Sequence, residues 1–183
     1  MRVEERRVLA SRRRFLGGLV SAATLTAPAR LIAGRREERV LSFFHTHTSE
    51  RLSVTYCAEG GYLADGLARL EHFLRDHRTG DEHGIDPHLF DLLYSLRQAT
   101  GTKSPFHVIS GYRSPVTNAK LRRASQGVAR GSLHLQGKAI DIRLADVSSA
   151  VLRDAALELG RGGVGYYHKS DFVHVDTGRV RRW

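Results

Sequence analysis

The feature that most constrains the fold of this chain is a pair of metal-ligand segments that lie about thirty residues apart. The first segment, residues 132–141, contains His134 and Asp141, and the second, residues 171–176, contains His174. Two imidazoles and one carboxylate are ligand types that Zn²⁺ takes in an open catalytic site, which needs three protein ligands and one free position. A fold that uses these residues together must bring the two segments side by side.

The local patterns around these residues indicate how that can happen. Residues 138–144 predict a short strand, and His134 lies in a glycine-containing loop just before it, so the chain can fold back and bring His134 beside Asp141. Residues 172–176 predict a second strand with His174 on one face. Two neighbouring strands can therefore present Asp141 and His174 to one point.

Two further carboxylates flank the second histidine. Asp171 lies three residues before His174, at the leading edge of the predicted strand, where a carboxylate could carry a proton. Asp176 lies two residues after His174 and on the same strand face, where it is the alternative candidate for a base or a group that orients the imidazole.

The pattern resembles that of the zinc peptidases of the D-Ala-D-Ala carboxypeptidase and lysostaphin superfamily. The signature Ser-x-His-x-x-Gly-x-Ala-x-Asp is matched from Ser132 to Asp141, and a carboxylate-x-x-His segment ends at His174. Residues 110–114, with the sequence SGYRS, are similar to another segment of that family. The run over residues 90–183 resembles the YcbK-type periplasmic murein endopeptidases.

The resemblance implies a role for each of these residues. Zn²⁺ would be held by His134, Asp141 and His174. Asp171 would be the general base or acid, although much of the superfamily carries a Glu there, which is one methylene longer. Arg113 would be the cation that stabilises the developing oxyanion.

Aromatic and imidazole side chains near these motifs are predicted to line the substrate cleft; they are Tyr112, Tyr166, Tyr167 and His168. His45 and His47 alternate in a strand-like run and could form a ligand pair, but carboxylates at a useful spacing are missing nearby. Four other histidines are predicted to be solvated, namely His72, His77, His83 and His88.

The N-terminus carries a twin-arginine pattern. Residues 11–16 read Ser-Arg-Arg-Arg-Phe-Leu, and a weakly apolar run over 17–26 precedes an A-x-A-like site at 27–29. The run is too short to span a bilayer, and no later stretch approaches the length required, so we expect no stable membrane insertion. The pattern predicts a signal peptide over residues 1–29, export to the periplasm by the twin-arginine route, a linker over 30–39 and one domain over 40–183.

Charge and cysteine content narrow the classes of function. The chain has a formal net charge of +10, and residues 1–29 hold six Arg and two Glu, so the remainder carries +6. These cations are dispersed and form no basic helix or aromatic–basic platform, which argues against nucleic acid as a partner and suits approach to an anionic polymer such as the cell wall. Cys57 is the only cysteine, so an internal disulfide is excluded.

The remaining periodicity predicts an α+β domain. Strands are expected at residues 40–44, 52–57, 106–110 and 164–167, and helices at 63–77, 86–100, 114–124 and 148–159. We expect a mainly antiparallel sheet, with helices packed on one face and the zinc site on the other.

Three functions are compatible with the predicted metal site and fold. The first is a zinc-dependent endopeptidase that hydrolyses peptide cross-links of peptidoglycan, with the stem peptides as its partner. The second is a carboxypeptidase that removes a terminal D-Ala in a closed-off cleft, and the third is a non-catalytic peptidoglycan-binding module. The carboxylate of Asp171 argues against a pure binder, which needs no base. Residue spacing leaves the choice between the two peptidases, and the oligomeric state, open.

Overall fold

The computed structural model describes residues 38–124 and 129–183. Its elements, in chain order, are β1 (Arg39–His45), β2 (Arg51–Ala58), β3 (Gly61–Tyr62), α1 (Ala64–Phe73), α2 (Pro87–Thr100), β4 (Phe106–Ser110), α3 (Pro115–Ala124), η1 (Leu133–Gln136), β5 (Ala139–Arg143), α4 (Ser149–Leu159), β6 (Gly163–Tyr167), η2 (His168–Ser170), β7 (Phe172–Asp176) and β8 (Arg181–Arg182). The predicted signal peptide and most of the predicted linker lie outside the described residues.

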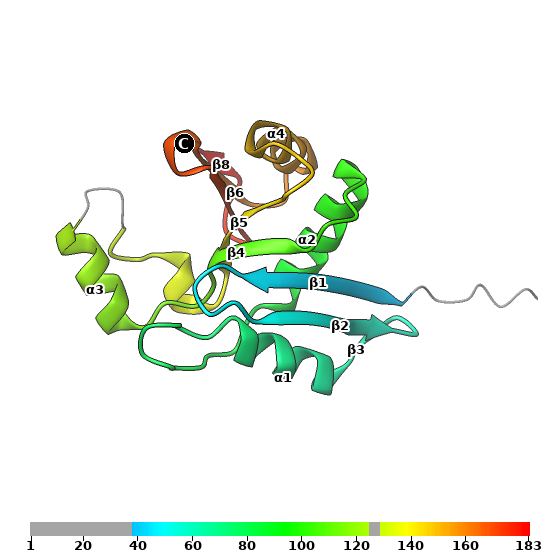
Figure 1. Ribbon diagram of the computed structural model, residues 1–183, viewed down its shortest axis with the longest axis horizontal. Helices are drawn as coiled ribbons and strands as arrows, with labels where there is room; N and C mark the ends of the chain where they lie inside the picture. The colour runs from blue at the N-terminus through cyan, green and yellow to red at the C-terminus, as the bar shows by residue number, and fades with distance from the viewer. Residues whose placement is uncertain (1–37, 125–128) are drawn as a thin grey trace, which may run out of the picture. The chain divides into compact units, whose positions relative to one another are not determined.

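The strands form one eight-stranded sheet in the order β3-β2-β1-β4-β5-β7-β6-β8. Strand β1 pairs antiparallel with β2 but parallel with β4, and β6 pairs antiparallel with β7 but parallel with β8. The α+β class is therefore confirmed, but the expectation of a mainly antiparallel sheet is corrected: the sheet is mixed. The chain returns from β2 to β4 through α1 and α2, and such a helical crossover allows β4 to run parallel to β1 (Figure 1).

Helices α2 and α4 begin and end where their capping residues predict. The Asp86 carboxylate accepts a hydrogen bond from the backbone N–H of His88, and Pro87 is the first helical residue of α2. The Ser148 side chain accepts from the backbone N–H of Val151 at the start of α4. Each of these helices is followed by a left-handed glycine, Gly101 or Gly160.

Helix α1 is shorter than predicted. It ends at Phe73 rather than near residue 77, because the next residues form a turn around the buried side chain of Asp76. At the other end of the helix, Gly66 lies so close to the backbone of Thr55 that a Cβ atom would clash with it. The helix therefore packs directly on β2, as Figure 1 shows.

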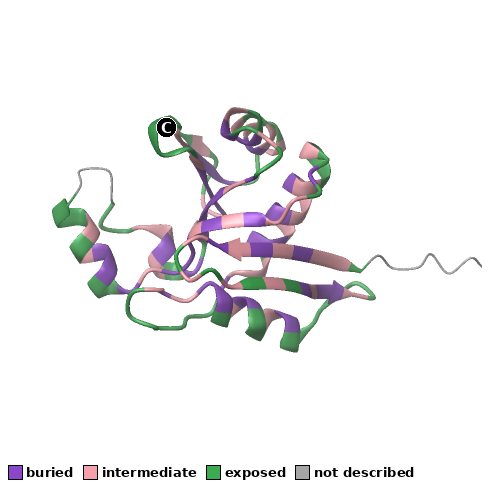
Figure 2. Ribbon diagram, viewed as in Figure 1, coloured by how far each residue is buried: buried purple, intermediate pink, exposed green. Residues whose placement is uncertain are grey.

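The hydrophobic core joins helices α1, α2 and α4 to one face of the sheet. Buried aromatic rings of the strands pack against the helices: Phe43 contacts Phe73 of α1, and Tyr56 contacts Phe90 of α2. Helix α4 contributes Leu152 to the same cluster. Figure 2 shows the buried residues concentrated along the central strands and the inner sides of these helices. Within residues 38–124 and 129–183, no helix is both long and apolar enough to cross a membrane.

The register of β5 and β7 separates the core from the candidate ligands. Asp141 lies opposite His174, and Ile140 lies opposite Val175 in the neighbouring pair. Because successive side chains of a strand point to opposite faces, Ile140 and Val175 enter the core while Asp141 and His174 project from the other face. A register shift in β4 between Val108 and Ser110 places Ser110 opposite Asp141 on the strand's other side.

Candidate metal centre

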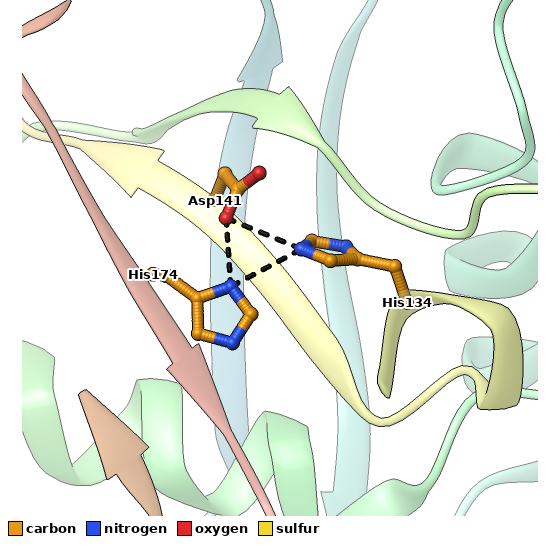
Figure 3. A group of neighbouring side chains, drawn as sticks. All are labelled: His134, Asp141 and His174. Atoms are coloured by element: carbon orange, nitrogen blue, oxygen red, sulfur yellow. Dashed lines mark hydrogen bonds and ion pairs between the residues drawn. The ribbon is translucent and has the colours of Figure 1, made fainter. Parts of the chain in front are cut away.

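The three predicted ligands meet at one point. His134 Nε2 lies 3.2 Å from Asp141 Oδ1 and 3.1 Å from His174 Nδ1, and these last two atoms lie 2.9 Å apart. All three residues are buried. Figure 3 shows that they come from three separate elements, η1, β5 and β7, and turn their side chains toward a common centre. The structure thus brings together residues that span forty positions of the sequence.

The outward-facing atom of each of these side chains has a partner of its own. His134 Nδ1–H donates to the backbone carbonyl of Gly111 at 2.7 Å, and His174 Nε2–H donates to Asp176 at 3.0 Å. The second oxygen of Asp141 accepts from the guanidinium of Arg113. These contacts hold the rings in place and leave His134 Nε2, His174 Nδ1 and Asp141 Oδ1 pointing inward.

The electrostatics favour a neutral His134 beside a charged Asp141. Burial lowers the pKa of His134. The pKa of Asp141 is also lowered: burial opposes its ionisation, but the two histidines and Arg113 outweigh that cost. Burial likewise disfavours a charged His174, yet its hydrogen bonds with Asp141 and Asp176 raise its pKa. A neutral imidazole and an ionised carboxylate are the forms that bind a cation.

This donor set fits a zinc ion. Four ligands at tetrahedral angles and the usual Zn–N and Zn–O bond lengths lie about 3.3 Å from one another. The separations of 2.9, 3.1 and 3.2 Å between the three inward-facing atoms are close to that value. The outer hydrogen bonds to Gly111 and Asp176 are of the kind that fixes the tautomer of a metal-binding histidine.

Asp176 orients His174, and both of its carboxylate oxygens accept further hydrogen bonds. Its side chain is fully buried and accepts backbone N–H groups of Gly163 at 3.0 Å and Gly178 at 2.8 Å. The guanidinium of Arg181 donates to both of its oxygens, at 3.0 and 2.7 Å. Although burial alone would raise the pKa of Asp176, these donors and His174 lower it. The carboxylate therefore stays charged and keeps the ring of His174 fixed.

Arg113 lies beside the three candidate ligands. Its Nε–H donates to Ser110 Oγ at 2.8 Å, and its backbone N–H donates to the carbonyl oxygen of His134 at 3.2 Å. One terminal nitrogen donates to Asp141, and the side chain lines the adjoining pocket. A guanidinium has five N–H donors, so contacts with Ser110 and Asp141 leave others for a ligand.

The structure does not bring Asp171 to this group. Asp171 is exposed, has a left-handed backbone with φ of 49°, and accepts a hydrogen bond from the hydroxyl of Ser149 at 2.7 Å. Ser149 is the first residue of α4, and Asp171 does not line the pocket beside the three ligands. Of the two carboxylates that flank His174, only Asp176 contacts it.

Three of the predicted cleft residues also lie elsewhere. Tyr112 is buried and stacks on the ring of His83, with 4.8 Å between ring centroids. The hydroxyl of Tyr166 lies 3.1 Å from His168 Nδ1, and the guanidinium of Arg153 from α4 covers its ring. None of these side chains lines the pocket, whereas Tyr167 does.

The pocket itself, called the central pocket below, has a volume of about 470 Å³ and is open beside the three ligands. Its lining includes residues that the sequence did not single out as cleft residues: Arg78, Phe172, Arg181 and Trp183. The ring of Trp183 lies 5.2 Å from that of His174, and its Nε1–H donates to the hydroxyl of Tyr167 at 3.1 Å. Strand β8, which places Trp183, has only two residues and leaves no periodic signal.

The central pocket also touches a second group of histidines. His47 lines it and stacks on His77, with ring centroids 4.3 Å apart and planes within 8°. The prediction that His77 is solvated is therefore wrong in part, because its ring is half-buried in this stack. His45 is buried behind them, and its Nδ1 accepts the backbone N–H of His47 at 3.2 Å.

Comparisons with known proteins show which family the chain resembles. Residues 34–183 match the model of a family described as peptidoglycan L,D-endopeptidase MepK. The chain is 43% identical over 177 residues to the peptidoglycan L,D-endopeptidase MepK of Escherichia coli K12, which covers 95% of this chain and 97% of that protein. It is 41% identical over 170 residues to a probable peptidoglycan L,D-endopeptidase MepK of Haemophilus influenzae, covering 92% and 91%.

Proposed function

The chain belongs to the peptidoglycan L,D-endopeptidase MepK family, and from this premise we propose that His134, Asp141 and His174 hold one Zn²⁺ for the hydrolysis of peptide cross-links. The chain is a peptidase that acts on peptidoglycan. The observation that carries the metal assignment is the convergence of three inward-facing ligand atoms, each belonging to a side chain whose outer atom already has a partner.

The protein's own residues would prepare this centre in a defined way. A bound Zn²⁺ supplies Lewis acidity and lowers the pKa of a water molecule. Gly111 and Asp176 set the tautomers of His134 and His174, so that both present a lone pair to the same point. Arg113 helps His134 and His174 to keep Asp141 ionised, and it has further N–H donors for the oxygen of a scissile carbonyl as charge develops on it.

Two carboxylates flank His174, and the contacts of each bear on which of them could act as a base. The sequence predicts Asp171 as the base, but its contact with Ser149 argues against this role, because a base must come within hydrogen-bond reach of the proton it takes. Asp176 is already engaged by His174, Arg181 and two backbone N–H groups, which favours positioning His174 over proton transfer. We also propose export to the periplasm through the twin-arginine signal over residues 1–29.

The proposed function can be tested on purified sacculi. Protein stripped of metal with a chelator should release nothing, and the same protein reloaded with Zn²⁺ should convert cross-linked muropeptide dimers to monomers. A carboxypeptidase would instead release free D-Ala and leave the dimers intact. A binding module would sediment with the sacculi without changing the muropeptide profile, and either of these two results would refute the endopeptidase proposal.

A further inference from the structure

We propose that Arg78 is a specificity-determining residue of the central pocket, where its guanidinium binds a free carboxylate of the peptidoglycan stem peptide. This inference rests on the proposed function and deepens it. It concerns recognition of the substrate beside the candidate metal centre and not the bond-breaking step.

The charges of the central pocket single out this residue. Three arginines line the pocket, and two of them are already neutralised: Arg113 pairs with Asp141, and Arg181 pairs with Asp176. The Arg78 guanidinium forms no hydrogen bond or ion pair with any residue in 38–124 or 129–183. Asp141 is the only acidic residue of the described lining, and it faces the other two ligands. The pocket thus offers an anionic ligand one arginine whose charge is not already matched.

The backbone of Arg78 is held in a fixed place. The Asp76 carboxylate accepts the backbone N–H of Arg78 at 3.0 Å and that of Ser114 at 2.9 Å. Ser114 follows Arg113 directly, so one buried carboxylate ties the backbone of Arg78 to the segment that carries Arg113. Asp76 also accepts the N–H of Gly80 through its own carbonyl at 2.7 Å, which closes the turn. The backbone of Arg78 is therefore fixed before a ligand arrives, and only the side chain has to become ordered on binding.

The histidine next to Arg78 in the sequence adds no positive charge at neutral pH. His77, the adjacent residue, stacks on His47 at the wall of the pocket. Burial lowers the pKa of His77 to about 4, and the cation of Arg78 contributes in the same direction. At neutral pH the ring of His77 is therefore uncharged and adds no positive charge next to Arg78.

The chemistry of a guanidinium indicates its ligand. Arginine pairs with a carboxylate through two parallel N–H···O bonds, and such charge-assisted contacts are stronger than neutral ones. Stem peptides of peptidoglycan present free carboxylates on their acidic residues, and amidation of such a group removes its charge. An enzyme that uses Arg78 in this way should therefore distinguish a free carboxyl from a carboxamide near the cleaved bond.

The test uses the full zinc-loaded protein and two soluble cross-linked stem dimers that differ only by amidation of the carboxyl group next to the cleaved bond. We expect the wild type to prefer the free acid by about 10–100-fold in kcat/KM, which is the range of one charge-assisted contact. Arg78→Gln should lose this preference through a higher KM for the free acid, and should change cleavage of the amidated dimer far less. Arg78→Lys should keep part of the preference.

Arg69→Gln is the matched control. Arg69 is an exposed arginine of α1 that does not line the central pocket, so its loss changes the net charge equally and should leave the preference intact. The inference is overturned if Arg78→Gln keeps the full preference, or if it loses activity equally on both dimers. Absence of cleavage of either dimer and of sacculi by the wild type would instead refute the proposed function, and the inference on Arg78 with it.

Discussion

Replacing Asp176 with asparagine should weaken metal binding without removing a metal ligand. The Asp176 carboxylate is fully buried and accepts hydrogen bonds from His174, Arg181, Gly163 and Gly178. Asparagine has the same shape but no charge, and its NH₂ group would face donors instead of accepting from them. The substitution therefore leaves His174 free to turn and Arg181 without its ion pair.

The expected magnitudes follow from these contacts. Breaking a buried ion pair costs about 3–5 kcal/mol of folding free energy. We expect about 3 kcal/mol here, the low end of that range, because the side chain of Arg181 is 31% exposed and can be rehydrated. Loss of the hydrogen bond that orients a ligand histidine lowers metal affinity by about 10–100-fold. Urea unfolding measures the first quantity, and a zinc titration against a competing chelator measures the second.

Asp171→Asn is the matched comparison, since it removes the same charge three residues before His174 instead of two residues after it. The Asp171 side chain is exposed, and within residues 38–124 and 129–183 its one side-chain hydrogen bond is with Ser149. This variant should therefore lose about 1 kcal/mol or less of folding free energy and bind zinc normally. If Asp176→Asn bound zinc as tightly as the wild type while Asp171→Asn did not, the assignment of the two carboxylates would be wrong. The base role predicted for Asp171 would require a loss of about 10²–10⁴-fold in turnover with zinc retained, whereas its contact with Ser149 leads us to expect turnover close to that of the wild type.

Two further predictions concern stability and export. Burial opposes ionisation of Asp76, but hydrogen bonds from Thr117, Arg78 and Ser114 outweigh this effect and lower its pKa to about 2. Its contribution to the free energy of unfolding is therefore complete above about pH 4, the pKa in the unfolded chain, and is lost as the pH falls toward 2. Urea unfolding across this range should show a smaller pH dependence in Asp76→Asn, and an unchanged slope would contradict the assignment. Arg12→Lys combined with Arg13→Lys should hold the precursor in the cytoplasm in a cell-fractionation assay, and undiminished periplasmic protein from the double variant would refute twin-arginine export.

Short-range patterns in the sequence predicted much of the fold and the convergence of the three candidate ligands. Strand alternation around Asp141 and His174 was enough to place them on one face, because the period of a strand is fixed by its backbone. The start of α2 followed from Asp86 and Pro87 for the same local reason. The parallel pairing of β1 with β4 was missed, because it depends on the route of the intervening helices and leaves no mark on either strand.

Side-chain direction in turns was the other part that the sequence did not determine. Asp171 has the spacing expected of a base, but its left-handed backbone turns the carboxylate toward Ser149 of α4. Tyr112 follows the same logic, since its place beside Arg113 in the sequence says nothing of its stacking on His83. These contacts join residues from separate elements, and no periodicity of a single segment reports them.

The most direct test of the central claim is the zinc content of the purified protein and of its His134→Ala variant, measured by elemental analysis after reconstitution and removal of free metal. We predict one zinc per chain in the wild type and none retained in the variant, because His134 Nε2 is one of only three inward-facing ligand atoms that the described residues bring together. Full zinc occupancy in His134→Ala would contradict the assignment of this site.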